Sequence, residues 1–277
     1  MSGIRRHPIR FLLGLIGFFL FLLGAALDFI FVFALTGRAR TRRGRAVWQQ
    51  RWAGIGLRVL RGRAEIRGPL PAGGILASNH LSYVDILVLG SLQPVVFVAK
   101  ADVERWPVLG WLAKCAGTLF IRREQRSHVA DVARQIAPVI EEGLPLLMFL
   151  EGTSTGGTHI LPFRPSLLEP VVANHWPATP VWIGYSLADG SVEDEIAYWR
   201  DMTLFPHLLN LLTKKSFTAH VAFGEPVRAP GDDRKELARR LQRQVCALAG
   251  EFGRNITVGS HWHALPEGPK ERSGVAE

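Results

Sequence analysis

The chain of 277 residues is long enough for one catalytic domain and an accessory segment, because single domains commonly contain about 100–250 residues. Hydrophobic residues make up 48% and charged residues 21%, which excludes a disordered chain. The two cysteines, Cys115 and Cys246, are too few for a disulfide scaffold and form no CxxC pair. We therefore expect two reduced thiols and no thiolate zinc site.

The net charge of +9 is concentrated near the N-terminus. Residues 1–50 hold eight arginines and one acid, Asp28, which gives +7 and leaves +2 for residues 51–277. Arginines that flank an apolar stretch are typical of contacts with anionic lipid head groups. A nucleic-acid-binding protein would instead need a basic patch on its folded domain. We therefore expect membrane lipids as partners and no nucleic acid.

The first predicted element is an apolar helix over residues 11–36. As a helix, 26 residues reach about 39 Å, enough to cross a hydrocarbon core of about 30 Å. Both flanks are basic, so the positive-inside rule gives no direction, and Gly24 and Asp28 interrupt the run. Two anchors stay open: one tilted span, or a helical hairpin in one leaflet with both ends cytoplasmic. A buried core helix is the third alternative.

From Trp48 onward the composition is typical of a soluble α/β domain. Apolar runs that predict buried strands are residues 73–78, 94–100, 118–122, 144–150, 179–185 and 217–223. Amphipathic helices are predicted over residues 127–142 and 233–252. We expect a mixed central sheet flanked by helices. The predicted organisation is a membrane anchor at 1–47, a catalytic domain at 48–254 and a flexible tail at 255–277.

The first motif whose side chains could catalyse a reaction is Ser78-Asn79-His80-Leu81-Ser82-Tyr83-Val84-Asp85, which follows a predicted strand. His80 can act as a general base, and Asp85 can orient the imidazole and stabilise the imidazolium. A spacing of five is not one helical face, so the pair meets only if His80 lies in a turn and Asp85 in the first helical turn. The alternative is a capping box in which Asp85 only caps a helix.

The second motif is a loop rich in glycine and hydroxyl groups after the predicted strand at 144–150. Its backbone N–H groups can surround an anion, and Glu151 can hold a substrate hydroxyl or a basic side chain. A flexible turn is the alternative. The loop also contains Gly152-x-Ser154-x-Gly156, the nucleophile-elbow pattern of serine hydrolases. That motif needs a helix directly afterwards, and Pro162 is a poor start for one.

The third motif is Arg122-Arg123 at the end of the predicted strand at 118–122. Guanidinium groups bind phosphate or carboxylate in a bidentate manner, and Lys100 after another strand is a similar candidate. The alternative is a solvated charge cluster. His159 and His175 have no metal-ligand spacing, so we expect no metal site.

Together these stretches resemble the glycerolipid acyltransferase family, over about residues 73–227. The family's Asn-His-x4-Asp block matches Asn79, His80 and Asp85. The second block matches Gly117, Phe120, Ile121 and Arg123, and the third matches Phe149, Glu151, Gly152, Thr153 and Ser154. The fourth, a strand that contains proline, matches Thr179-Pro180-Val181.

The resemblance implies acyl transfer from acyl-CoA or an acyl carrier protein thioester to a lysolipid hydroxyl. The first expected acceptor is 1-acyl-sn-glycerol-3-phosphate, which gives phosphatidic acid. His80 is the implied general base and Asp85 its orienter. Head-group contacts are implied for Arg123 and Lys100. The implied acceptor pocket is formed by Glu151, Gly152 and Thr153.

No metal, bound cofactor or covalent acyl-enzyme is implied, because the thioester is already activated. The lysolipid and the product both partition into the bilayer, so the site must lie at its surface. We expect the enzyme at the cytoplasmic face of a bacterial inner membrane.

Two departures from the family pattern concern the acceptor. Leu150 stands where proline is usual, and Ser154 stands where many phosphatidate-forming members have arginine, which removes one phosphate contact. The continuation Thr155-Gly156-Gly157 and the stretch at 199–203 resemble the lyso-ornithine lipid acyltransferase subgroup. Lyso-ornithine lipid is therefore the alternative acceptor. A serine esterase that uses Ser154 and a non-catalytic lipid-binding protein are the alternatives of other classes.

Overall fold

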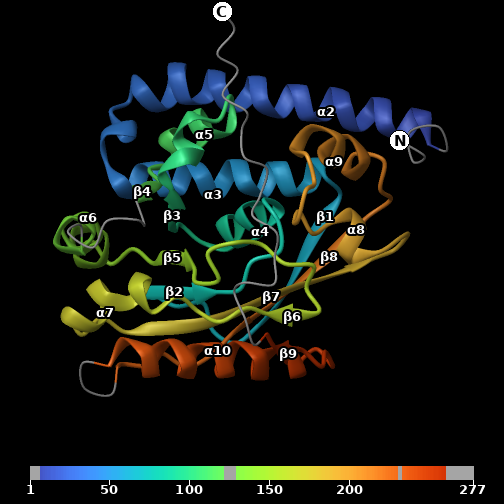
Figure 1. Cartoon of the computed structure of the whole chain (residues 1–277). Coiled ribbons are helices and arrows are strands. Elements are labelled where there is room, and N and C mark those ends of the chain that lie inside the picture. The colour runs from blue at the N-terminus through green and yellow to red at the C-terminus, as the bar shows by residue number, and fades with distance from the viewer. Residues whose placement is uncertain (1–6, 122–128, 230–232, 260–277) are drawn as a thin grey trace, which may run out of the picture.

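The computed structural model describes residues 7–121, 129–229 and 233–259. A seven-stranded sheet in the order β1-β8-β7-β2-β5-β3-β4 forms the centre of the molecule (Figure 1). Its strands are β1 (Gly62–Arg67), β2 (Ile75–Ser78), β3 (Val96–Lys100), β4 (Leu119–Ile121), β5 (Leu146–Phe149), β7 (Ala178–Leu187) and β8 (Phe217–Phe223). The pair β7–β8 is antiparallel and the other pairs are parallel, so the sheet is mixed, as predicted.

Each of the six predicted strands is present, with ends that differ by a few residues. Strand β1 was not predicted. Its Arg63, Glu65 and Arg67 alternate with apolar side chains, and among the described strands it pairs with β8 alone. An edge strand of this kind has too little apolar character to be read as a buried run.

Helices cover both faces of the sheet (Figure 1). They are α3 (Arg42–Val59), α4 (Val84–Leu92), α5 (Leu109–Ala116), α6 (Val129–Glu141), α7 (Glu169–Ala173), α8 (Val192–Glu195), α9 (Leu204–Leu211) and α10 (Arg234–Gly250), with the short helices η2 (Arg38–Arg40), η3 (Ala101–Arg105) and η5 (Pro165–Leu168). A separate two-stranded sheet pairs β6 (His159–Ile160) with β9 (Thr257–Val258).

Side chains along the strands point alternately into two apolar cores, one on each face of the sheet. On β5, Leu147 and Phe149 belong to the core that includes residues of α3 and α4, whereas Leu146 and Met148 belong to the core shared with α6 and α10. This alternation is the two-residue period of a strand with both faces covered. The loops after β2 and β5 both begin at the carboxyl edge of this covered sheet.

The apolar N-terminal segment forms α2 (Pro8–Leu27), which continues as the π-helical turn η1 (Asp28–Ala34). Figure 1 shows α2 running across the top of the molecule above α3. Two close approaches hold it there: a Cβ on Gly14 would meet the Leu212 carbonyl oxygen at 2.9 Å, and one on Gly24 would meet the Trp52 ring at 2.8 Å. The chain therefore has a helical hairpin, α2 and α3, lying along the domain.

The predicted boundary between anchor and domain at residue 47 falls inside α3. This helix begins after Thr41, whose hydroxyl accepts from the Gly44 N–H, and continues without interruption to Val59. Its buried side includes Ala46, Trp48 and Leu57. The anchor thus shares its second helix with the body of the domain, and the division of the chain stays a prediction.

Candidate active site

The motif Asn79–Asp85 begins where β2 ends, at the carboxyl edge of the parallel strands. Ser78, the last residue of β2, lies opposite Val181 of β7, so the backbone of Ile183 extends beyond its strand partner. The Asn79 side chain replaces that partner: its amide donates to the Ile183 carbonyl, and its oxygen accepts from the Ile183 N–H, both at 2.8 Å. Asn79 thus fixes the start of the loop to β7.

His80 and Asp85 are in direct contact. The His80 Nδ1 and the Asp85 Oδ2 are 2.7 Å apart, with His80 in the loop and Asp85 in the first turn of α4. The Asp85 Oδ2 also accepts from the backbone N–H groups of Leu81 at 2.7 Å and Ser82 at 3.0 Å. Asp85 therefore does both things that the sequence left open: it binds backbone N–H groups ahead of the helix and holds the imidazole.

The hydrogen bonds determine the tautomer of His80. The Asp85 Oδ2 already accepts from two backbone N–H groups, so it acts as an acceptor here and the Nδ1 of His80 is the donor in their contact. This leaves the Nε2 lone pair available as a base. The His80 ring stacks on Phe149 with centroids 3.9 Å apart, and its side chain is 21% exposed. The imidazole is therefore fixed in orientation and still reachable from outside.

Glu151 lies two residues after the end of β5 and is fully buried. One carboxylate oxygen accepts from the His80 N–H at 2.8 Å and the other from the Leu161 N–H at 2.7 Å. Burial raises the pKa of Glu151 to about 8, against the lowering effect of these two hydrogen bonds. Its predicted part in the acceptor pocket stays a prediction. In this geometry the carboxylate acts through the His80 backbone and the loop that it holds.

The rest of the loop after β5 turns back to the His80 loop. Gly152 has φ 75°, a conformation that favours glycine, and the neighbouring Thr153 is exposed. The Thr155 N–H donates to the His80 carbonyl at 3.0 Å. Thr155 thus joins this loop to the histidine loop, and the role of Gly152 and Thr153 in the acceptor pocket stays a prediction.

The nucleophile-elbow prediction at Ser154 does not fit the structure. The chain after Ser154 leads into β6, whereas that motif requires a helix at this point. The Ser154 hydroxyl donates its proton to the carbonyl of Tyr198. This serine therefore holds two loops together.

Tyr198 and Trp199 pack against both loops of the site, and these contacts were not predicted. The Tyr198 N–H donates to the Leu81 carbonyl at 2.8 Å, and the Trp199 ring lies where a Cβ on Gly156 would meet it at 2.6 Å. Only glycine fits at position 156 against this tryptophan. Periodicity gave no signal for these contacts, because they join residues more than 40 positions apart in the chain.

Lys100 ends β3, at the same edge of the sheet as His80 but two strands away from β2. Its side chain is 51% exposed, and its Nζ is 2.6 Å from the Asp102 carboxylate. It faces Ile121, the last residue of β4. Arg123, the other predicted head-group contact, lies outside the described residues.

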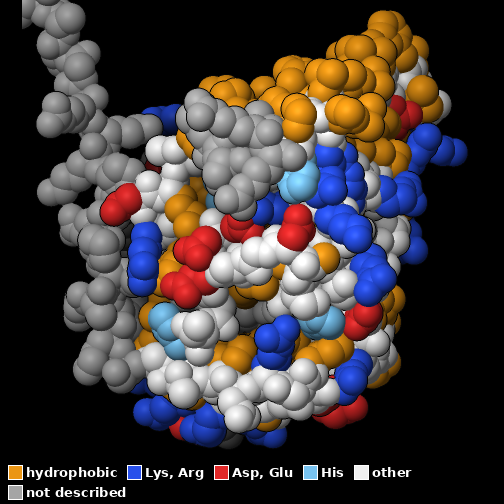
Figure 2. Space-filling model, turned by 90° about the vertical axis from the view of Figure 1, so that its right-hand side faces the viewer, with side chains coloured by type: hydrophobic (Ala, Val, Ile, Leu, Met, Phe, Trp, Pro, Cys, Tyr) orange, Lys and Arg blue, Asp and Glu red, His pale blue; other side chains and the backbone are white. Residues whose placement is uncertain are grey.

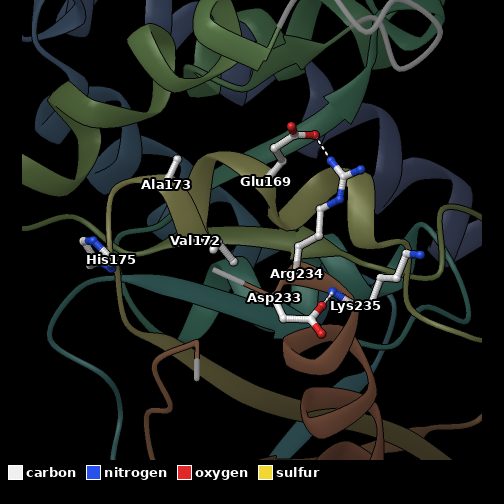
Figure 3. A pocket seen from close by; sticks show the side chains of 7 residues that line it. All are labelled: Glu169, Val172, Ala173, His175, Asp233, Arg234 and Lys235. Atoms are coloured by element: carbon white, nitrogen blue, oxygen red, sulfur yellow. Dashed lines mark hydrogen bonds and ion pairs between the residues drawn. The ribbon is translucent and has the colours of Figure 1, made fainter. Parts of the chain in front are cut away.

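A surface cavity of about 800 Å³ lies away from His80. Figure 3 shows it between α7 and the start of α10, with Glu169 and Arg234 paired across it. His175 also lines it, just before the amino end of β7. It is therefore at the opposite edge of the sheet from His80. Within residues 7–121, 129–229 and 233–259, no group of three or more His, Cys, Asp or Glu side chains could hold a metal ion.

Known proteins that resemble this chain identify its class. A family model described as Acyltransferase matches residues 63–184. A lyso-ornithine lipid O-acyltransferase from Pseudomonas aeruginosa is 36% identical over 181 residues, which cover 65% of this chain and 69% of that protein. The chain belongs to the acyltransferase family, as the sequence motifs predicted, and is an enzyme of that class.

Two further relatives extend the comparison. A 1-acyl-sn-glycerol-3-phosphate acyltransferase from Neisseria meningitidis serogroup B is 28% identical over 182 residues, which cover 65% of this chain and 71% of that one. The crystal structure of a 1-acyl-sn-glycerophosphate acyltransferase from Thermotoga maritima has a TM-score of 0.67 and covers 90% of this chain and 97% of that one. At 18% identity, this likeness concerns the fold alone.

Proposed function

We propose that this protein is a membrane-bound lysolipid O-acyltransferase in which His80 is the general base. The observation that carries the proposal is the contact of 2.7 Å between the His80 Nδ1 and the buried Asp85 carboxylate, which leaves the Nε2 of a partly exposed imidazole free to accept a proton. The position of this pair at the carboxyl edge of the sheet, where open α/β folds bind ligands, supports it further.

The proposed reaction needs no covalent enzyme intermediate. The lysolipid hydroxyl attacks the thioester carbonyl carbon while the His80 Nε2 takes the hydroxyl proton. Asp85 stabilises the imidazolium that forms. The tetrahedral intermediate then collapses, the carbon–sulfur bond breaks, and the proton passes from the imidazolium to the departing thiolate. The products are the acylated lipid and a free thiol.

We propose lyso-ornithine lipid as the acceptor, with 1-acyl-sn-glycerol-3-phosphate as the second candidate. Identity to the lyso-ornithine lipid relative is 36%, against 28% for the glycerophosphate relative. Ser154 supports the same order, because its hydroxyl is engaged by Tyr198 at the position where many phosphatidate-forming enzymes have a phosphate-binding arginine. Lys100 and Arg123 are proposed to contact the acceptor head group, whose ornithine carboxylate suits cationic side chains.

The acceptor assay tests this order. Membranes that contain the protein are offered labelled acyl-CoA or labelled acyl carrier protein, together with lyso-ornithine lipid or 1-acylglycerol-3-phosphate. We expect kcat/KM to be at least about tenfold higher for lyso-ornithine lipid, a difference of about 1.4 kcal/mol in transition-state binding. Whichever donor supports faster transfer is the co-substrate. A tenfold higher kcat/KM for 1-acylglycerol-3-phosphate would reverse the acceptor assignment. The proposed chemistry would remain the same.

The apolar helix supports association with the membrane. Its exposed side chains include Leu12, Leu13, Ile16, Phe19, Leu20 and Leu23, and Trp106 and Trp111 around α5 are also exposed. Figure 2 shows hydrophobic side chains gathered along the upper edge of the molecule, where α2 lies. We propose that this edge dips into one leaflet of the inner membrane from the cytoplasmic side. Exposed arginines at the turn between α2 and α3 would contact the head groups: Arg38, Arg40, Arg42 and Arg43.

The contacts of α2 favour this in-plane anchor over a single span. Near its start, the Arg10 guanidinium donates to the Thr213 carbonyl at 3.2 Å, and near its end the Trp52 indole donates to the Asp28 carboxylate at 2.7 Å. Both ends of a helix of about 30 Å are therefore attached to the same side of the domain. A span would have to break one of these attachments.

Cysteine accessibility tests this anchor. His7→Cys and Thr36→Cys place thiols at the two ends of the apolar segment, and the unsubstituted chain gives the background of Cys115 and Cys246. We expect a membrane-impermeant maleimide to label both variants in inside-out vesicles and neither in spheroplasts. Labelling of the two positions from opposite sides would establish a span and overturn the in-plane proposal.

A further inference from the structure

Strand β7 contacts the catalytic motif at two alternate residues. The backbone of Ile183 pairs with the side-chain amide of Asn79. The phenolic hydroxyl of Tyr185 donates a hydrogen bond to the Asp85 Oδ1 at 2.5 Å. Ile183 acts through its backbone, in the plane of the sheet, and Tyr185 acts through its side chain, so β7 holds both ends of the motif. The partners are 104 and 100 positions apart in the chain.

The two oxygens of Asp85 have separate partners. Oδ2 accepts from the His80 Nδ1 and from the backbone N–H groups of Leu81 and Ser82, whereas Tyr185 is the side chain that donates to Oδ1. Tyr185 is 3% exposed, and its ring packs against Phe217. Burial and the neighbouring Asp85 charge raise the pKa of Tyr185 well above its usual value, so the hydroxyl stays protonated as a donor.

We propose that Tyr185 is a positioning residue for the acyl transfer. Its hydroxyl fixes the plane of the Asp85 carboxylate so that Oδ2 faces His80, and it stabilises the charge that orients the imidazole. The inference rests on the proposed function of His80 and Asp85 and extends it by a third side chain. Tyr185 itself is buried behind Asp85, so we propose that it acts through Asp85.

Other charged or titratable groups contact this assembly from three directions. Glu151, after β5, accepts from the His80 N–H. The Arg164 guanidinium, after β6, donates to the Glu151 carbonyl at 3.3 Å. Arg254, after α10, donates to the backbone carbonyl of Tyr185 at 3.2 Å. Tyr185→Phe leaves all three groups in place, so a difference in pH profile between variant and wild type reports on the phenolic hydroxyl.

The test is the pH dependence of kcat for Tyr185→Phe. Without the hydroxyl, the Asp85 charge has fewer donors and stabilises the imidazolium more strongly. The acidic limb of the profile then moves to higher pH, by about 0.5–1 pH unit. We expect kcat at the optimum to fall about tenfold, because the carboxylate is held less firmly, and the KM for the acceptor to stay unchanged.

Two matched changes complete the experiment. Tyr83→Phe removes the phenolic hydroxyl of a partly buried tyrosine, which is paired at 3.0 Å with His207 and not with Asp85. This variant should leave the acidic limb in place. 3-Fluorotyrosine incorporated at position 185 is a stronger donor and should move the limb to lower pH, which keeps the test available if the phenylalanine variant folds poorly.

An acidic limb that stays in place in both position-185 variants would overturn the role of Tyr185. His80→Ala, measured in the same assay, distinguishes a failure of the proposed function from a failure of the inference about Tyr185. If it retains activity, the proposed function itself fails. If it is inactive while the position-185 variants keep the wild-type profile, only the inference about Tyr185 fails.

Discussion

His80→Ala is expected to lower kcat by about 10²–10⁴-fold, the usual contribution of a positioned general base. The substitution removes the Nε2 that accepts the hydroxyl proton. It leaves the backbone N–H that Glu151 accepts and the carbonyl that Thr155 binds, so the loop keeps its fold. The KM for the acceptor should change little. The measurement is initial-rate acyl transfer at saturating donor.

The matched control is His175→Ala, which removes a histidine from the opposite edge of the sheet. It should have wild-type kcat. If both variants had rates within about threefold of wild type, the base would have to be another group, since threefold is less than 1 kcal/mol of transition-state stabilisation.

Asp85→Asn is expected to have an effect of similar size, about 10²–10⁴-fold on kcat. The amide has nearly the volume of the carboxylate, and its oxygen can still accept from the N–H groups of Leu81 and Ser82. The negative charge is lost, however, so the imidazolium that forms during the reaction is no longer stabilised. The variant should therefore remain folded and lose most of its acyltransferase activity.

Glu169→Gln is the control for Asp85→Asn, because it also converts an ion-paired carboxylate to an amide, at the distant cavity. We expect wild-type kcat and a small change in stability, as for other surface ion pairs. Circular dichroism and thermal melting of both variants separate loss of fold from loss of chemistry. An Asp85→Asn variant with wild-type kcat would mean that Asp85 only binds backbone N–H groups at the start of α4 and has no part in catalysis.

The parts of the fold that the sequence predicted are those that depend on local pattern. Strands β2, β5 and β7 are continuous apolar runs, since both faces are covered, and α10 shows one apolar face at helical spacing. The missed β1 is an edge strand with alternating charges. The sequence left the anchor open between one span and a hairpin within residues 11–36, because composition alone does not distinguish a helix that crosses a membrane from one that lies on it. In the structure α2 and η1 follow one another without a hairpin turn, and α2 packs against α3.

The site was predicted in part for the same physical reason. The contact between His80 and Asp85 is local, five residues apart, and follows from the turn into α4. The side chains that support this contact come from distant strands, and no spacing rule links Asn79 to Ile183 or Asp85 to Tyr185. Glu151 was predicted to line the acceptor pocket. Its hydrogen bond to the His80 N–H became visible only in three dimensions, because it joins two loops 71 residues apart.

The central claim is that His80, and not Ser154, carries out the chemistry as transfer to a lysolipid. The most direct measurement follows labelled acyl groups from the thioester in membranes that contain wild type, His80→Ala or Ser154→Ala, with lyso-ornithine lipid present. The account predicts labelled diacyl product from wild type, its loss with His80→Ala, and most of it retained with Ser154→Ala. Release of free fatty acid that requires Ser154 and survives His80→Ala would contradict the account and identify a hydrolase.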